Sequence, residues 1–333
     1  MQSEADTILV TGATGFIGLN LLHILNRMPY AVIGLSNRPL PDLARDSLAD
    51  QGPMPIIELT DVRDGDAVSK TFARHQPDLV IHAAAVTAGA ERERSQARTI
   101  VDVNVGGTQS VLDACSEVGV KHLLHVSSGA VYGSVTFGEQ PISEVTTGDP
   151  STLYGITKLV AEQLVHRHRE LHDLNATIGR LSAAFGPWEY PSGDRDFMSP
   201  FLQLAKAAGA GAAITLVRDA PRNWVYAPDA AKALIDLTLV PSTKEDCYNV
   251  CPETTMTVGL FAERLRMAYP DIDLSVVDDP RDATIKLDAD PRDKRAPVSA
   301  RRLAAELGPG RWSTPAEACD DYISWGRAHP TWL

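Results

Sequence analysis

Tyr154 and Lys158 stand four residues apart in a stretch with helical spacing of apolar residues, so both side chains are expected on one face of a helix. A tyrosine has an ordinary pKa of about 10 and is a poor base at neutral pH, but a neighbouring ammonium stabilises its phenolate. Ser128 lies 26 residues before Tyr154, at the expected end of a strand. Its hydroxyl can donate a hydrogen bond to a substrate oxygen. The three side chains together suit the movement of a proton at a hydroxyl while a hydride moves to or from a nicotinamide; the alternative is that Tyr154 only packs or caps.

A glycine-rich loop near the N-terminus indicates where such a cofactor binds. The segment Thr11–Gly18 follows an apolar strand-like stretch and precedes apolar residues at helical spacing. Gly12 allows a sharp turn, Gly15 allows the close approach of a pyrophosphate, and Gly18 allows the helix to lie close on the sheet. The helix N-terminus then offers N–H groups and a partial positive charge to the phosphates. The cofactor contacts expected in this loop are Gly12, Thr14, Gly15, Phe16, Ile17 and Gly18.

The end of the second strand bears on the choice between NAD and NADP. A dinucleotide fold usually places an acid on the adenosine ribose roughly 20 residues past the glycine loop. Ser36, Asn37 and Arg38 stand there instead. Because an acid would repel a 2′-phosphate and a cation would accept it, this composition favours NADP over NAD. The alternative is that Arg38 is only a solvated loop residue.

Two further strand ends supply expected cofactor contacts. Asp61 and Val62 follow the third strand, where an acid can meet the adenine amino group or serve as a helix N-cap. Ala83, Ala84 and Ala85 follow the fourth strand, and small residues suit a place where the cofactor passes close over strand ends.

The elements that must position these residues alternate between strand and helix. Expected strands are 8–10, 31–35, 56–59, 78–82, 122–126 and 177–181. The alternation predicts an α/β fold with a doubly wound parallel sheet. Residues 1–180 would form the dinucleotide-binding domain and residues 181–333 mainly a smaller substrate-binding domain, with segments near 221–250 returning to the sheet.

Composition limits the classes of partner. The 333 residues carry a net charge of −12, which argues against nucleic acid and anionic membranes as partners. Four scattered cysteines do not form a disulfide framework, and no metal site is expected from them. No N-terminal hydrophobic signal appears, and no apolar run reaches the length of a membrane span. These properties are typical of a reduced, cytoplasmic protein that acts on a small molecule.

The motifs together resemble the extended short-chain dehydrogenase/reductase family, the NAD(P)-dependent epimerases and dehydratases similar to UDP-glucose 4-epimerase. The resemblance rests on the glycine loop, on Asn104-Val105-Gly106-Gly107-Thr108, on Ser127-Ser128 with Val131-Tyr132-Gly133, and on Tyr154-Gly155-Ile156-Thr157-Lys158. It implies a Rossmann-type fold.

The resemblance also assigns roles to single residues. Tyr154 would be the catalytic acid/base, Lys158 would hold the nicotinamide ribose, and Ser128 would orient the substrate. Asn104 would belong to the cofactor site and support the active-site helix. Tyr132 and Arg222 would contact substrate, with Arg222 matching a phosphate-contacting arginine. The helices around 105–117 and 153–171 would form a homodimer contact.

Departures from the family pattern narrow the substrate. Gly129-Ala130 stand where dehydratases carry an Asp-Glu pair, so sugar dehydration is not expected. Ala183 replaces an asparagine common in nucleotide-sugar enzymes, and residues 217–221 replace a Gly-Asp-Gly turn. Three hypotheses remain: a dehydrogenase or reductase that releases NADP(H), a nucleotide-sugar 4-epimerase that retains NAD, and a non-catalytic NADP-binding regulator.

Overall fold

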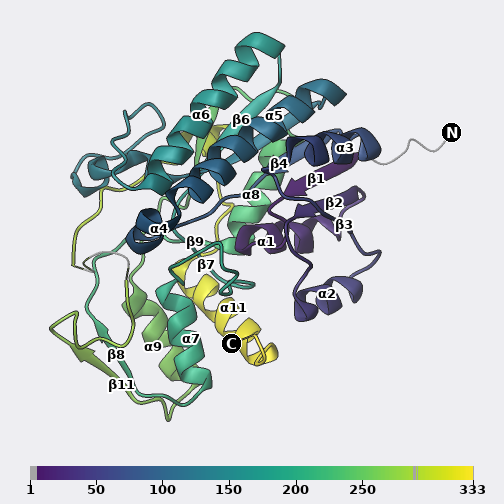
Figure 1. The fold of residues 1–333 in the computed structure, drawn as a ribbon. Helices are drawn as coiled ribbons and strands as arrows, with labels where there is room; N and C mark the ends of the chain where they lie inside the picture. Colours follow the sequence, from purple (N-terminus) through teal and green to yellow (C-terminus); the bar gives the residue numbers. More distant parts are fainter. Residues whose placement is uncertain (1–5, 288–289, 291, 333) are drawn as a thin grey trace.

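A computed structural model describes residues 6–287, 290 and 292–332. Its centre is a parallel sheet of seven strands in the order β10-β6-β5-β4-β1-β2-β3 (Figure 1). The strands are β1 (Thr7–Thr11), β2 (Ala31–Ser36), β3 (Ile56–Leu59), β4 (Leu79–His82), β5 (His122–Ser128), β6 (Ala176–Leu181) and β10 (Cys247–Val250). This arrangement confirms the predicted doubly wound, Rossmann-type sheet.

Helices cover both faces of the sheet, as parallel strands require. One face is packed by α3 (Gly65–His75), α5 (Gly107–Val118) and α6 (Leu153–His172). The other face is packed by α1 (Phe16–Leu25) and α8 (Ala227–Leu239), with α2 (Asp42–Ala49) and α10 (Arg301–Leu307) against the same core. The carboxyl ends of β1, β4 and β5 are in register through Thr11, His82 and His125, so the loops that follow these strands meet at one edge.

The charged stretch before α5 is helical. It forms α4 (Ala90–Val101), which continues through a π-helical turn, η1 (Asp102–Gly106), into α5. Solvated charges on α4 are compatible with a helix because its exposed face is polar, and only Ile100 is buried on it.

The chain beyond β6 divides between the sheet and a smaller unit (Figure 1). β10 returns to the sheet edge beside β6, whereas β9 (Val225–Tyr226) pairs with β7 (Ala184–Phe185) in a separate two-stranded sheet. The smaller unit contains β8 (Ile214–Val217) paired with β11 (Leu274–Val277), and the helices α7 (Pro200–Gly209), α9 (Val258–Ala268) and α11 (Pro315–Ala328). Aromatic residues from these elements pack in a core of their own.

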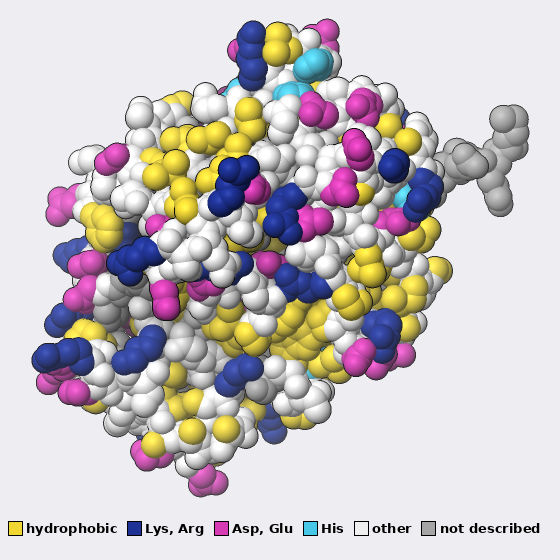
Figure 2. Space-filling model, in the orientation of Figure 1, with side chains coloured by type: hydrophobic (Ala, Val, Ile, Leu, Met, Phe, Trp, Pro, Cys, Tyr) yellow, Lys and Arg dark blue, Asp and Glu magenta, His cyan; other side chains and the backbone are white. Residues whose placement is uncertain are grey.

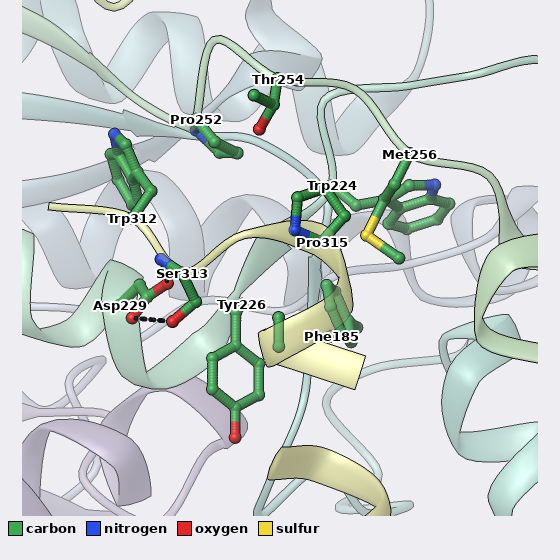
Figure 3. A pocket seen from close by; sticks show the side chains of 11 residues that line it. Phe185, Trp224, Tyr226, Asp229, Pro252, Thr254, Met256, Trp312, Ser313 and Pro315 are labelled. Carbon is green, nitrogen blue, oxygen red and sulfur yellow. Dashed lines mark hydrogen bonds between the residues drawn. The ribbon is translucent and has the colours of Figure 1, made fainter. Parts of the chain in front are cut away.

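A small pocket lies at the base of this unit, where β9 leads into α8 (Figure 3). Figure 3 shows Trp224, Tyr226 and Phe185 among its lining side chains, and Asp229 accepts a hydrogen bond from the Ser313 hydroxyl at 3.2 Å. None of the predicted catalytic or cofactor residues lines it, so this pocket belongs to the packing of the smaller unit. Within the described residues, no helix is both long and apolar enough to cross a membrane.

Candidate active site

The glycine loop leaves no room for a side chain at Gly12 or at Gly18. Gly12 adopts φ +66°, and a Cβ there would lie 2.7 Å from the backbone of Ala84. A Cβ on Gly18 would lie 2.1 Å from the carbonyl oxygen of Gly12. Glycine is therefore needed both for the turn between β1 and α1 and for the close packing of α1 on the sheet.

The N-terminus of α1 is open to an anion. Its N-cap, Gly15, offers no side chain to the first N–H groups, and the first turn contains no acidic residue. A Cβ on Gly15 would meet only the Gly12 carbonyl, at 3.2 Å. Uncapped N–H groups and the helix dipole in this position fit a dinucleotide pyrophosphate.

The end of β2 lies beside a carboxylate that the sequence did not predict there. Ser36 lies beside Thr14, with their hydroxyl oxygens 2.5 Å apart, and the Arg38 Nε donates to Asn37 at 3.2 Å. No carboxylate follows β2 in the sequence, but the structure brings one there, because Asp194 forms an ion pair with Arg38. Sequence reasoning missed Asp194 because it lies 156 residues from Arg38 along the chain.

The third strand end holds a second arginine–carboxylate pair. Arg63 contacts Asp61 at 2.6 Å, and these hydrogen bonds hold the pKa of Asp61 below its usual value. The N-cap of α3 is Asp64, whose carboxylate accepts from the Ala67 N–H at 3.0 Å. Val62 is buried against Gly107, where a Cβ would lie 2.6 Å from its side chain.

The carboxyl end of β5, which carries Ser128, lies against the first turns of α6, which carry Tyr154 and Lys158. Ser128 ends β5, and its hydroxyl accepts from the Ala130 N–H at 3.1 Å. The first turn of α6 packs directly on this loop, because a Cβ on Gly155 would lie 2.6 Å from the Ala130 carbonyl oxygen. The half-buried Tyr154 is thus carried by a helix turn in contact with the Ser128 loop.

Lys158 is held by the sheet beneath. It is 2 % exposed, and its Nζ donates to the Val126 carbonyl at 2.6 Å and lies 3.4 Å from Nε2 of His125. Burial lowers the pKa of Lys158 to about 8. Burial also lowers the pKa of His125, which is neutral and can accept from the ammonium. The position of Lys158 is therefore set by fixed groups of β5.

A buried ion pair supports the same helix one turn further on. The Glu162 carboxylate is 0 % exposed and contacts Arg180 on β6 at 2.7 Å. Glu162 also accepts from the Ser127 hydroxyl, so the residue before Ser128 is tied to α6. Sequence reasoning missed this pair; the available signal was a glutamate four residues after Lys158, and therefore on the same face of the helix.

Asn104 affects the site indirectly, through hydrogen bonds to other groups of the protein. Its side chain accepts from the Val86 N–H at 2.7 Å and donates to the Val86 carbonyl and to the Thr157 hydroxyl, both at 3.0 Å. These bonds join the loop after β4 to α6. Asn104 therefore positions the helix that carries Tyr154 and Lys158, and its amide is already engaged by protein groups.

The two other residues expected at the substrate lie in different surroundings. Tyr132 is 1 % exposed; its hydroxyl donates to Asn249 at 2.6 Å and accepts from Arg180 at 3.1 Å. These bonds tie Tyr132 into the buried network around Arg180, and its contact with substrate stays a prediction. Arg222 leads into β9 and donates to the Asp290 carbonyl at 3.2 Å.

One loop of the smaller unit crosses the dinucleotide-binding edge, and we call residues 187–198 the strap. The Tyr190 hydroxyl donates to the Thr14 carbonyl at 2.7 Å, and the Arg195 guanidinium lies over the Phe16 ring at 5.3 Å. The same loop pairs with the segment after β4 through a backbone bridge at Thr87. The strap thus contacts the glycine loop, the end of β2 and the end of β4.

Comparisons with known proteins agree with this geometry. Residues 8–251 match the sequence pattern of the NAD dependent epimerase/dehydratase family. dTDP-glucose 4,6-dehydratase 1 of Escherichia coli is 28% identical, over 73% of this chain and 71% of its own. The low-salt glycan biosynthesis protein Agl12 of Haloferax volcanii is 31% identical, over 73% and 76%.

Among solved structures, UDP-glucose 4-epimerase of Thermotoga maritima superimposes with a TM-score of 0.80 at 21% identity, covering 97% of this chain and 99% of its own. This likeness shows the shared fold of sheet and smaller unit. The glycine loop, the Ser128 loop and α6 all lie within the matched residues 8–251, and the chain is an enzyme of the NAD-dependent epimerase/dehydratase family.

Proposed function

We propose that this enzyme transfers a hydride between NAD(P) and a hydroxyl-bearing or carbonyl carbon of a sugar-like substrate, with Tyr154 as the acid/base. One observation carries the proposal: Lys158 is buried and fixed on β5 beneath the α6 turn that presents Tyr154 beside the Ser128 loop. A fixed ammonium beside a tyrosine suits proton transfer at a hydroxyl. When bound, the nicotinamide supplies the hydride acceptor or donor.

The residues have separate tasks in this proposal. Ser128 donates a hydrogen bond to the substrate oxygen and orients it. Tyr154 takes the proton from that oxygen during oxidation and returns it during reduction. Lys158 favours the phenolate and holds the nicotinamide ribose. Asn104 keeps α6 in place through Thr157.

The dinucleotide would lie along the carboxyl edge of the sheet. Its pyrophosphate would meet the loop of Gly12, Gly15 and Gly18 and the N-terminus of α1, and its adenine would lie near Asp61 and Val62. We propose a preference for NADP, with Ser36, Asn37 and Arg38 receiving the 2′-phosphate. The support is a guanidinium at the end of β2 and no acid in the sequence at that point.

Elimination of water is not part of the proposed reaction. Dehydration of a sugar needs an acid and a base beside the hydride-transfer site. Gly129 and Ala130 follow Ser128 in the turn η2 (Gly129–Tyr132), and neither has an ionisable side chain. The dehydratases among the relatives therefore share the fold and cofactor chemistry with this proposal, but not the full reaction.

A second candidate is a UDP-sugar 4-epimerase that retains its NAD. The specific observation in its favour is the full-length likeness to a UDP-glucose 4-epimerase. Ala183 in place of an asparagine and the guanidinium at the end of β2 weigh against it.

The nucleotide released on denaturing freshly purified protein separates the two candidates. Stoichiometric NAD in the released fraction would support the epimerase and count against the first proposal, in which NADP(H) is released. A protein without bound nucleotide that reduces added NADP with a sugar-like alcohol would support the first proposal. Stopping that reaction with Tyr154→Phe would tie it to the site described.

We propose a cytoplasmic homodimer that contacts through α5 and α6. Figure 2 shows hydrophobic side chains on the upper part of the surface, where α6 lies in Figure 1. The exposed hydrophobic residues of α6 include Ile156, Val160 and Leu171. Light scattering during size-exclusion chromatography is expected to give the dimer mass. Val160→Asp is expected to give a monomer, and a wild-type monomer would overturn this proposal.

A further inference from the structure

Asp194 gives the end of β2 the carboxylate that its own sequence lacks. The Arg38 guanidinium forms an ion pair with Asp194 and also donates to the Ser192 carbonyl, so two strap residues occupy its donors. The two side chains are 26% and 34% exposed. An approaching ligand can therefore reach and replace this contact.

We propose that Asp194 is a specificity-determining residue, which competes with the 2′-phosphate of NADP(H) for Arg38 and so limits the preference for NADP(H) over NAD(H). The inference rests on the proposed function, since it assumes a dinucleotide with its adenosine ribose near Arg38. NADP(H) must displace Asp194 to reach the guanidinium. NAD(H) has a 2′-hydroxyl and leaves the ion pair intact.

The charges around Asp194 make this competition selective. A phosphate monoester carries a charge of about −1.5 to −2 at neutral pH. The guanidinium therefore attracts it more strongly than it attracts a carboxylate. The phosphate and the carboxylate repel each other when both lie beside Arg38. Arg92 and Arg63 are the other cations that act on Asp194, and Asp61 adds a further negative charge. Arg63 already holds Asp61, and Arg92 donates to the Gly193 carbonyl and pairs with Asp196. Arg38 is thus the cation for which the two anions compete.

The strap remains attached when Asp194 is displaced. Asp196 accepts from the Gly89 N–H at 2.8 Å and pairs with Arg92 at 3.2 Å. The Tyr190 hydroxyl still donates to the Thr14 carbonyl. Loss of the Asp194 contact therefore removes a negative charge beside Arg38, while the other contacts hold the strap in place. Asp196 lies on the same loop and offers a matched control.

Calorimetric titration with NADPH and NADH tests the inference on the full chain. In Asp194→Asn the dissociation constant for NADPH is expected to fall roughly fivefold to tenfold, the effect of a charge-assisted contact that no longer has to be broken. The constant for NADH is expected to change less than about twofold, because its binding breaks no such contact. Asp196→Asn is expected to leave the ratio of the two constants unchanged. The double variant Arg38→Ala/Asp194→Asn is expected to show no gain for NADPH over Arg38→Ala.

Two results would overturn the inference alone. The first is an unchanged NADPH to NADH ratio in Asp194→Asn, in a variant whose melting temperature and NADH affinity match wild type. The second is an equal gain in Asp196→Asn, which would trace the effect to a looser strap. Failure of every form to bind either nucleotide would instead overturn the proposed function, and the inference with it.

Discussion

The two ends of the proposed dinucleotide site are built differently. At the nicotinamide end, Lys158 and the Glu162–Arg180 pair are buried and bonded to the sheet. At the adenosine end, the Arg38–Asp194 and Asp61–Arg63 pairs lie at the surface with partly exposed side chains.

Burial explains why the two ends suit different tasks. A buried charge is costly without a fixed partner, so the groups around Tyr154 are held in one arrangement before substrate arrives. Surface ion pairs contribute little and exchange readily with other ions. The proposed catalytic end is therefore held in place by buried contacts, whereas we expect that changes at the proposed ribose end alter cofactor preference without loss of the fold.

Removing the acid/base at the proposed catalytic end is expected to have the largest effect. Tyr154→Phe removes the hydroxyl that exchanges the proton, so turnover is expected to fall roughly ten-thousandfold, or about 5.5 kcal/mol in activation free energy. Steady-state kinetics measures the loss, and calorimetry is expected to show unchanged NADPH binding. Tyr30→Phe, distant from the site, serves as the control. Near-normal turnover in Tyr154→Phe would refute the assigned role.

Breaking the buried pair beneath the site comes next. Glu162→Ala leaves the Arg180 guanidinium buried without its carboxylate, and the free energy of unfolding is expected to fall by about 4 kcal/mol. Urea denaturation measures this. The matched surface change is Asp102→Ala, which removes the exposed partner of Arg98 and is expected to cost less than about 0.5 kcal/mol. Equal losses in the two variants would remove the contrast between buried and exposed pairs.

The cost of burying Lys158 predicts a pH dependence. Because burial lowers the Lys158 pKa from 10.5 to about 8, the unfolded chain binds this proton more tightly than the folded one between those values. The penalty is complete below pH 8 and disappears as the pH rises toward 10.5. Lys158→Met is therefore expected to raise the free energy of unfolding by about 3 kcal/mol at pH 7 while abolishing turnover.

The increase in the free energy of unfolding that Lys158→Met gives is expected to shrink between pH 8 and pH 10.5. Urea denaturation at pH 7, 9 and 10 measures it. A variant that is less stable than wild type at pH 7, or a gain that does not depend on pH, would show that burial does not set the charge of Lys158.

The smallest expected effect lies at the adenosine end. Arg38→Ala removes the cation proposed for the 2′-phosphate, so NADPH affinity is expected to fall about tenfold and NADH affinity less than about twofold. Calorimetric titration measures both constants, with Arg45→Ala on the neighbouring helix as the control. Equal NADPH binding in Arg38→Ala would assign the 2′-phosphate elsewhere.

Sequence reasoning succeeded where function depends on neighbours along the chain. The glycine loop, the alternation of strands and helices, and the spacing of Tyr154 and Lys158 are local patterns, and the predicted parallel sheet was confirmed. The sequence also indicated that segments near 221–250 return to the sheet; β10 does, whereas β9 pairs with β7 in a separate sheet.

Contacts between distant segments could not be predicted in this way. The Arg38–Asp194 pair joins residues 156 positions apart, and the Glu162–Arg180 pair depends on how α6 lies against β6. The sequence correctly showed that no acid directly follows β2, but the fold brings a carboxylate of the strap to that position. The resemblance placed Tyr132 at the substrate, and the structure adds a hydrogen bond from its hydroxyl to Asn249 that the sequence did not indicate.

We propose that Ser128, Tyr154 and Lys158 support hydride transfer between the nicotinamide and a sugar that loses no water. The most direct measurement is product analysis by NMR after incubating the enzyme with NAD or NADP and a panel of UDP-sugars, dTDP-sugars and free sugars, with absorbance followed at the nicotinamide band. We predict an oxidised, reduced or epimerised sugar that keeps all its oxygens, formed by wild type and not by Tyr154→Phe. A dehydrated sugar would exclude the proposed reaction. A product that Tyr154→Phe forms equally well would exclude Tyr154 as the acid/base.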